Sequence, residues 1–204
     1  MCAVLSVVVV LKRMSFIGQG ISHAAFGGVG VAAVLGVWLG GPASGGLASG
    51  GLAQGLIVLA FCLAAALLIA WLSDRHGATA DTAIGIVLVG SMAAGAILIH
   101  LAWKASRTPM PSWESVLFGS IFAVDEAGAW AACSATVATL LALWWFRRPL
   151  LFWAFDEPAA GAFGVPARRM KVLLVVLLTP PIVTGMKLVG VVLATALLVL
   201  PGAT

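Results

Sequence analysis

Charge is what this sequence has least of. Only 9% of its 204 residues are charged, whereas soluble domains average about 25%. Together with 62% hydrophobic residues and a mean hydropathy of +1.15, this scarcity excludes an ordinary soluble domain. The net charge of +4 does not indicate a nucleic-acid partner, because the basic residues lie in short flanks between apolar runs, where they act as orientation signals. We predict an integral membrane protein in contact with lipid.

Motifs that carry chemistry are also missing. The three cysteines, Cys2, Cys62 and Cys133, show no CxxC spacing, and we expect them to be buried small apolar residues. No HExxH or GxSxG motif occurs, and the three histidines are scattered. An intramembrane enzyme is therefore a remote alternative, and no tightly bound cofactor is expected.

The chain is organised around residues 15–36, an apolar stretch long enough to cross a membrane as a helix. It carries Gln19 and His23, which lie on one helix face because residues four apart are neighbours. If the helix begins near Met14, His23 is about 14 Å along it at 1.5 Å per residue, near the middle of a hydrocarbon core about 30 Å thick. Polar residues at this depth indicate a lined path across the membrane, and the alternative for both is an interhelical hydrogen bond.

The same stretch carries a second pattern, in which every fourth residue is small. Small residues at this spacing let another helix approach closely, and packing drives helix association in lipid. We therefore predict a helix-packing ridge at Gly20, Ala24, Gly28, Ala32 and Gly36.

Further apolar runs complete an all-α, polytopic transmembrane bundle of about six to seven spans, with residues 1–204 forming one domain. Residues 1–11 are too short to span, residues 40–55 are expected to be a flexible linker, and residues 112–124 a partial or re-entrant element. Pro180 and Pro181 are expected to break or kink their helix. The other predicted spans are 56–72, 81–101, 127–146 (stopping at Arg147-Arg148-Pro149), 170–186 and 188–200.

The basic residues give an orientation. If the Lys12 side faces the cytoplasm, eight Lys and Arg lie inside and three outside, which agrees with the positive-inside rule. The inner set is Lys12, Arg13, Arg75, Arg147, Arg148, Arg168, Arg169 and Lys171, and the outer set is Lys104, Arg107 and Lys187.

Between two inner basic clusters lie residues 155–166, FDEPAAGAFGVP. Asp156 is a favourable N-cap, and Glu157 and Pro158 occupy favoured first-turn positions. Gly164 can close the C-terminus, and Pro166 prevents continuation. We predict a short cytoplasmic helix with Phe155, Phe163 and Val165 available for contact, either as a docking element or as a plain surface loop.

Five blocks of this sequence resemble the permease subunits of the zinc/manganese/iron ABC importers. They are RMSFIGQGISHAAFGGVGVA from position 13, ADTAIGIV from 80, LFGSIFAV from 117, FDEPAAGAFGVP from 155 and MKLVGVVLATALLVLPGAT from 186. The blocks keep their order and cover nearly the whole chain.

This resemblance implies a multi-pass permease in the plasma membrane of a prokaryote, working as a homo- or heterodimer with a second permease subunit. The implied partners are a cytoplasmic ATPase, which hydrolyses the ATP, and an extracytoplasmic metal-binding protein. The permease itself is then not an enzyme. The family normally has a complete first helix and one or two more after PGAT, so we expect a partial sequence.

The resemblance also assigns roles to residues. His23 matches a pathway histidine, whereas Gln19 stands where the family often has Asp, which removes a negative charge. The two are candidate transient ligands for a transported divalent metal ion. Residues 155–166 match the coupling helix seated in the ATPase. A permease for an iron chelate or a cobalamin-type ligand is the alternative function.

Overall fold

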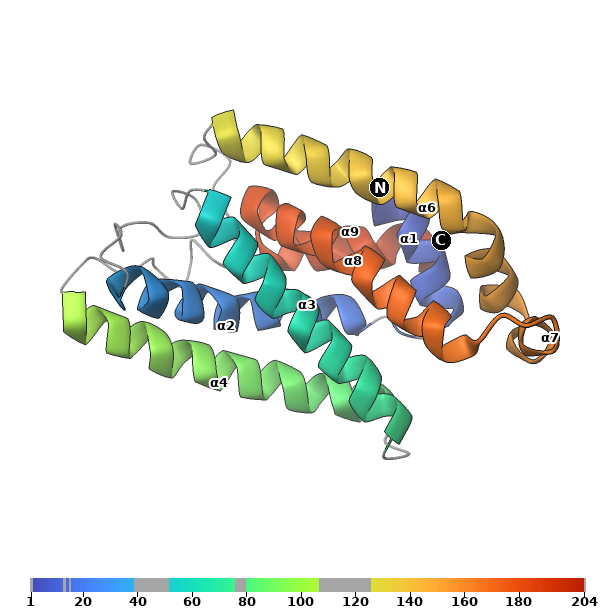
Figure 1. Cartoon of the computed structure of the whole chain (residues 1–204), viewed down its shortest axis with the longest axis horizontal. Coiled ribbons are helices and arrows are strands. Elements are labelled where there is room, and N and C mark those ends of the chain that lie inside the picture. The colour runs from blue at the N-terminus through green and yellow to red at the C-terminus, as the bar shows by residue number, and fades with distance from the viewer. Residues whose placement is uncertain are drawn as a thin grey trace.

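The computed structural model describes residues 2–12, 14, 16–38, 52–75, 80–106 and 126–203. Every regular element in this part of the chain is an α-helix, which confirms the predicted fold class (Figure 1). The helices are α1 (Cys2–Leu11), α2 (Ile17–Trp38), α3 (Leu52–Arg75), α4 (Ala80–Ser106), α6 (Glu126–Phe155), α7 (Glu157–Ala162), α8 (Ala167–Val189) and α9 (Val191–Ala203).

Helix α2 is the central element of the bundle. It packs against α3, α4, α8 and α9, and 61% of its apolar 18-residue window is buried, against 11% for α6. Figure 1 shows α2 and α4 lying side by side along one edge, with α3 crossing them and α8 beside α3. The helix that the sequence singled out therefore packs against four of the other described helices.

Close backbone approach explains how α2 is packed so tightly. A Cβ on Gly30 would lie 2.9 Å from the carbonyl oxygen of Gly95 in α4, and a Cβ on Gly28 would lie 3.1 Å from the Cα of Val58 in α3. Both neighbours are backbone atoms, which cannot move aside as a flexible side chain could. A methyl group at Gly30 would force α2 and α4 apart, and one at Gly28 would need α3 to move by a few tenths of an ångström, so glycine permits the close approach of these helices.

Contacts near the two ends of the bundle show the relative directions of α3 and α8. Near one end, Lys171 Nζ in α8 donates a hydrogen bond to Ser73 Oγ in α3 at 2.9 Å. Toward the other end, Lys187 Nζ would lie 2.8 Å from a Cβ on Gly55. Helices α3 and α8 are therefore antiparallel, and the predicted inner residue Lys171 and outer residue Lys187 lie toward opposite ends.

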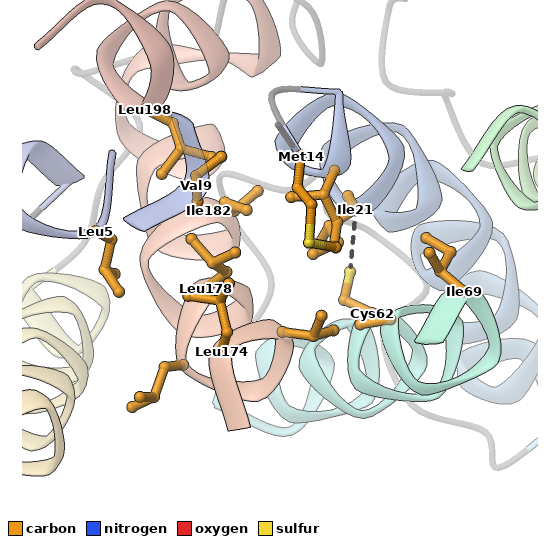
Figure 2. Packing of buried hydrophobic residues seen from close by; sticks show 14 of the residues in the cluster. Leu5, Val9, Met14, Ile21, Cys62, Ile69, Leu174, Leu178, Ile182 and Leu198 are labelled. Carbon is orange, nitrogen blue, oxygen red and sulfur yellow. Dashed lines mark hydrogen bonds between the residues drawn. The ribbon is translucent and has the colours of Figure 1, made fainter. Parts of the chain in front are cut away.

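A continuous apolar core joins the first and last helices to the centre. Figure 2 shows Leu5 and Val9 of α1 near Leu198 of α9, with the side chains of α8 between them and α2. Cys62 lies on the α3 side of this core, and its thiol contacts the carbonyl oxygen of Ile21 at 3.8 Å, so it is buried as predicted. The same prediction is wrong for Cys133, which is exposed because α6 buries only a narrow face.

Five described helices, α2, α3, α4, α6 and α8, are long and apolar enough to cross a membrane. Helix α1 has 10 residues and α9 has 13, so neither reaches that length in the described chain. A multi-pass helical bundle is confirmed, and the count of six to seven spans stays a prediction.

Two predicted helix ends are wrong. Helix α6 does not stop at Arg147-Arg148-Pro149 but continues to Phe155, because Leu150, Trp153 and Ala154 bury their side chains in the core. Helix α8 passes through Pro180-Pro181 and Lys187 and ends only before Gly190, whose φ of 88° favours glycine. A kink at the prolines stays a prediction.

The predicted re-entrant element at residues 112–124 lies outside the described residues, as does most of the predicted linker, residues 40–51. The last four linker residues, 52–55, are helical, since α3 begins at Leu52. Residues 53–55 are Ala-Gln-Gly and lead directly into the apolar run of α3, which extends the helix backwards by a turn.

Candidate functional site

One face of α2 is polar and left open by the other described helices. Gln19 is exposed, His23 one turn later is half-buried, and Phe16 just before the helix is exposed. Neither the Gln19 nor the His23 side chain forms a hydrogen bond to another residue in the described ranges. The predicted pair thus lies together on one face and is not joined to a neighbouring helix there.

The small-residue ridge lies on an adjacent face of α2, about 100° around the helix from Gln19 and His23, because each ridge residue follows the polar positions by one. Gly20, Ala24, Gly28 and Ala32 are buried, and Gly36 near the end of the helix is half-buried. A Cβ on Gly20 would lie 2.7 Å from Ile84 Cγ2 in α4 and 3.5 Å from Ile69 Cδ1 in α3. The ridge therefore packs within the chain, so its small residues do not set the width of the path that Gln19 and His23 would line.

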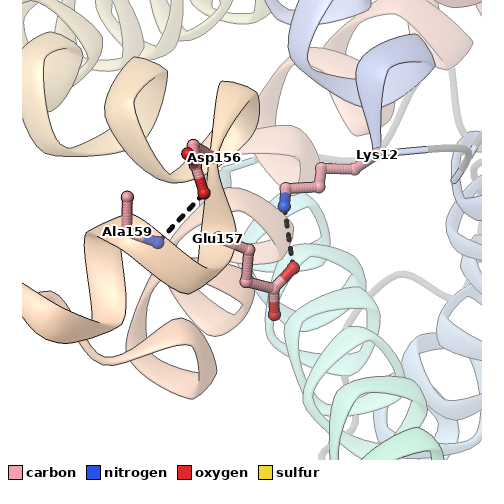
Figure 3. Close-up of polar contacts among 4 residues, drawn as sticks. All are labelled: Lys12, Asp156, Glu157 and Ala159. Atoms are coloured by element: carbon pink, nitrogen blue, oxygen red, sulfur yellow. Dashed lines mark hydrogen bonds and ion pairs between the residues drawn. The ribbon is translucent and has the colours of Figure 1, made fainter.

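The local structure of the elbow at residues 155–166 agrees with the sequence. The Asp156 carboxylate accepts a hydrogen bond of 2.9 Å from the Ala159 backbone N–H at the start of α7 (Figure 3). Pro158 lies in the first turn. Gly164 takes a φ of 81° after the helix, and the Val165 N–H then donates to the Ala160 carbonyl. Capping at both ends stabilises a helix of only six residues.

The elbow presents aromatic side chains outward. Phe155 is 74% exposed and Phe163 is 80% exposed, while Val165 is half-buried and less available than predicted. The Phe163 ring contacts the ring of Phe152 edge-on, with centroids 5.8 Å apart. Ala160 is fully buried and fixes α7 against the bundle. Phe155 and Phe163, which flank α7, are thus exposed apolar side chains beside a helix that Ala160 anchors to the bundle.

The structure also contains a contact that sequence reasoning missed. Lys12, which the sequence identified only as an orientation signal, forms an ion pair of 2.8 Å with Glu157 at the start of α7 (Figure 3). Its ammonium group lies 4.2 Å from the centroid of the Trp153 ring. These residues are 145 and 141 positions apart (157 − 12 and 153 − 12), so no local pattern could have paired them.

Metal-ligand residues do not cluster in the part of the chain that the structure describes. No group of three or more His, Cys, Asp and Glu side chains comes together there. The chain offers one imidazole and one amide on the open face of α2.

Comparison with known proteins identifies the family of this chain. The profile described as the ABC 3 transport family matches residues 1–204. The chain belongs to this family. As an ABC 3 family chain whose described part contains five helices of membrane-spanning length, it is a multi-pass protein of a prokaryotic plasma membrane. The predicted family is confirmed.

Two curated relatives of this ABC 3 family chain are named for manganese. The chain is 36% identical over 196 residues to the manganese import system permease protein ScaB of Streptococcus parasanguinis, covering 96% of this chain and 63% of that protein. It is 32% identical over 205 residues to the manganese transport system membrane protein MntC of Halalkalibacterium halodurans, covering 100% and 63%.

A solved structure has a similar fold. It is described as PsaBC from Streptococcus pneumoniae in complex with Fab, and it matches with a TM-score of 0.73 and 33% identity. The match covers 99% of this chain and 66% of that chain. The ABC 3 family chain thus spans about two thirds or slightly less of the length of the proteins it resembles.

Proposed function

We propose that this chain is the principal part of a permease subunit that carries divalent metal ions into the cytoplasm, with Mn²⁺ as the first cargo to test. Family membership and two relatives named for manganese transport support this proposal. Zn²⁺ and Fe²⁺ suit the same nitrogen and oxygen ligands and are the competing cargoes.

The open face of α2 is the observation that carries the proposal. An unpaired imidazole and amide facing lipid would cost free energy, because hydrocarbon offers them no hydrogen-bond partner. A second permease subunit covering this face would form a polar seam instead. Two copies would contribute two His23 and two Gln19 side chains, a sparse ligand set that binds an ion and also releases it.

The energy for transport would come from a separate ATPase that binds α7. The capped helix with exposed Phe155 and Phe163 suits docking into an apolar groove. The chain itself would perform no chemistry, and an extracytoplasmic binding protein would deliver the ion. A permease for an iron chelate or a cobalamin-type ligand is the second candidate, and the names of the relatives give it less support.

Metal uptake by the complete transporter in proteoliposomes tests this function. We expect His23→Ala to lower Mn²⁺ uptake by about ten-fold, the effect of losing one interaction of about 1.4 kcal/mol. Gln19→Asp adds a negative ligand and is expected to lower the KM for the ion. The matched control is His100→Ala, which removes an exposed histidine from α4 and should leave uptake unchanged.

Unchanged uptake in His23→Ala would remove His23 from the pathway. Uptake of a chelated iron or a corrinoid without competition by free Mn²⁺ would instead support the second candidate. Absence of the ATPase from the purified wild-type complex would overturn the assignment as an ABC permease subunit.

A further inference from the structure

Lys12 connects the end of α1 to helix α7, the proposed docking element for the ATPase. It directly follows α1, and its ammonium group pairs with Glu157 of α7 at 2.8 Å (Figure 3). The Lys12 side chain is 14% exposed, whereas Glu157 is 51% exposed. The cation is therefore mostly enclosed, and the carboxylate closes the open side of its site.

Trp153 of α6 forms the other wall of this site. The ring is 3% exposed, its centroid lies 4.2 Å from Lys12 Nζ, and its Nε1–H has no hydrogen-bond partner among the described residues. A cation over an indole face is attracted by the ring quadrupole, more strongly when water is excluded. By contrast, Arg147 lies 5.6 Å from the exposed Trp144 ring, where solvent screens the contact. Of these two contacts, the one made by Lys12 is enclosed and is shared between α6 and α7.

Backbone hydrogen bonds connect Lys12 to the start of α2. The Lys12 N–H donates to the Val8 carbonyl, and the Met14 N–H donates to the Val9 carbonyl, which ties both residues to the end of α1. The Met14 carbonyl in turn accepts from the Ile17 N–H, the first residue of α2. Met14 is buried, so its packing and these hydrogen bonds connect the end of α1 to the start of α2. His23 follows Ile17 by about 9 Å along the helix.

We propose that Lys12 is a positioning residue that transmits movement of α7 to α2. The inference rests on the proposed function, in which the ATPase moves α7. When α7 shifts, Glu157 and Trp153 would carry the Lys12 ammonium group with them, and the turn at Met14 would carry that displacement to α2. The polar face with Gln19 and His23 would then change its position at each ATP cycle.

The test is a double-mutant cycle in the complete transporter, reconstituted with its ATPase and binding protein. The variants are Lys12→Met, Glu157→Gln and the double substitution, and the measured quantity is Mn²⁺ transported per ATP hydrolysed. We expect each single variant to assemble, to hydrolyse ATP and to transport about five-fold less ion per ATP. The double variant should be no worse than either single one, since both remove the same contact.

Arg147→Met is the matched control, because it removes an exposed cation above a tryptophan of the same helix α6. It should retain the wild-type ratio. A wild-type ratio in both Lys12→Met and Glu157→Gln, or additive losses in the double variant, would overturn the inference. If the Lys12→Met variant fails to assemble, the transport ratio of Glu157→Gln alone tests the inference. Glu157 is half-exposed, so its substitution should not prevent folding.

The two proposals fail in different ways. A wild-type complex that neither retains an ATPase nor transports the ion contradicts the proposed function. A wild-type complex that transports normally, with variants that keep the same ratio, contradicts only the role of Lys12.

Discussion

Individual glycines have different roles in this bundle although the sequence presents them alike. A Cβ on Gly95 would lie 2.8 Å from the carbonyl oxygen of Phe26 in α2, whereas Cβ atoms on Gly85 and Gly90 of the same helix would meet nothing within 4 Å. The first glycine lies at a helix–helix contact and the other two on an open face. Only the packing of α2 against α4 distinguishes them.

We therefore expect Gly95→Ala to destabilise the protein by about 1–3 kcal/mol, because the added methyl group would meet backbone atoms and force the two helices apart. The thermal midpoint in detergent measures this loss. Gly90→Ala is the matched control on α4 and should leave the midpoint unchanged or slightly higher. Equal midpoints for the two variants would contradict the close approach of α2 and α4.

Helix α7 shows how far local sequence can specify a single element. Its capping residue, first-turn proline and closing glycine are all in the order that favours a short helix, and the structure has this helix with the predicted cap. Six residues cannot form a stable helix by propensity alone. The caps and the buried Ala160 therefore carry most of its stability.

Asp156→Ala should loosen α7, because it leaves the Ala159 N–H without its acceptor and costs about 1 kcal/mol. We expect amide hydrogen exchange across residues 157–165 to become about five-fold faster. Asp156→Asn keeps an oxygen acceptor at the same place and should exchange like the wild type. Protection that survives in Asp156→Ala would show that tertiary contacts alone hold the helix.

Longer elements depend less on such local signals. Pro149 lies inside α6, and Pro180 and Pro181 lie inside α8, although proline lacks a backbone N–H. Membrane helices tolerate proline because neighbouring helices, Ser and Thr side chains and local adjustments satisfy the freed backbone groups. The sequence predicted a stop at Pro149 and a break or kink at Pro180-Pro181, because the packing of a helix against its neighbours cannot be read from one segment.

At the scale of the whole molecule, the helical bundle has two opposite ends. Helix α7 lies toward one end of the bundle, and the C-terminal end of α2 lies toward the other (Figure 1). Phe163 directly follows α7, and Trp38, the last residue of α2, is 85% exposed. The positive-inside rule predicts that the α7 end faces the cytoplasm.

A membrane-impermeant maleimide tests this orientation in a variant from which Cys2, Cys62 and Cys133 have been removed. We expect Trp38→Cys to react in intact cells and Phe163→Cys to react only after the cytoplasmic face is opened. Labelling of Phe163→Cys from outside would invert the topology and remove α7 from reach of any ATPase. Ser22→Cys, which is buried, is the control for background labelling.

The sequence by itself determined the membrane class, the central helix, the pairing of Gln19 with His23 on one face and the caps of α7, because each depends on composition or on residues within one or two turns. The tertiary structure alone decided that the ridge of α2 packs inside the chain, that α6 and α8 continue through their prolines, and that Lys12 meets Glu157 and Trp153. These outcomes depend on which surfaces of distant segments are brought together, and short-range periodicity carries no information about that.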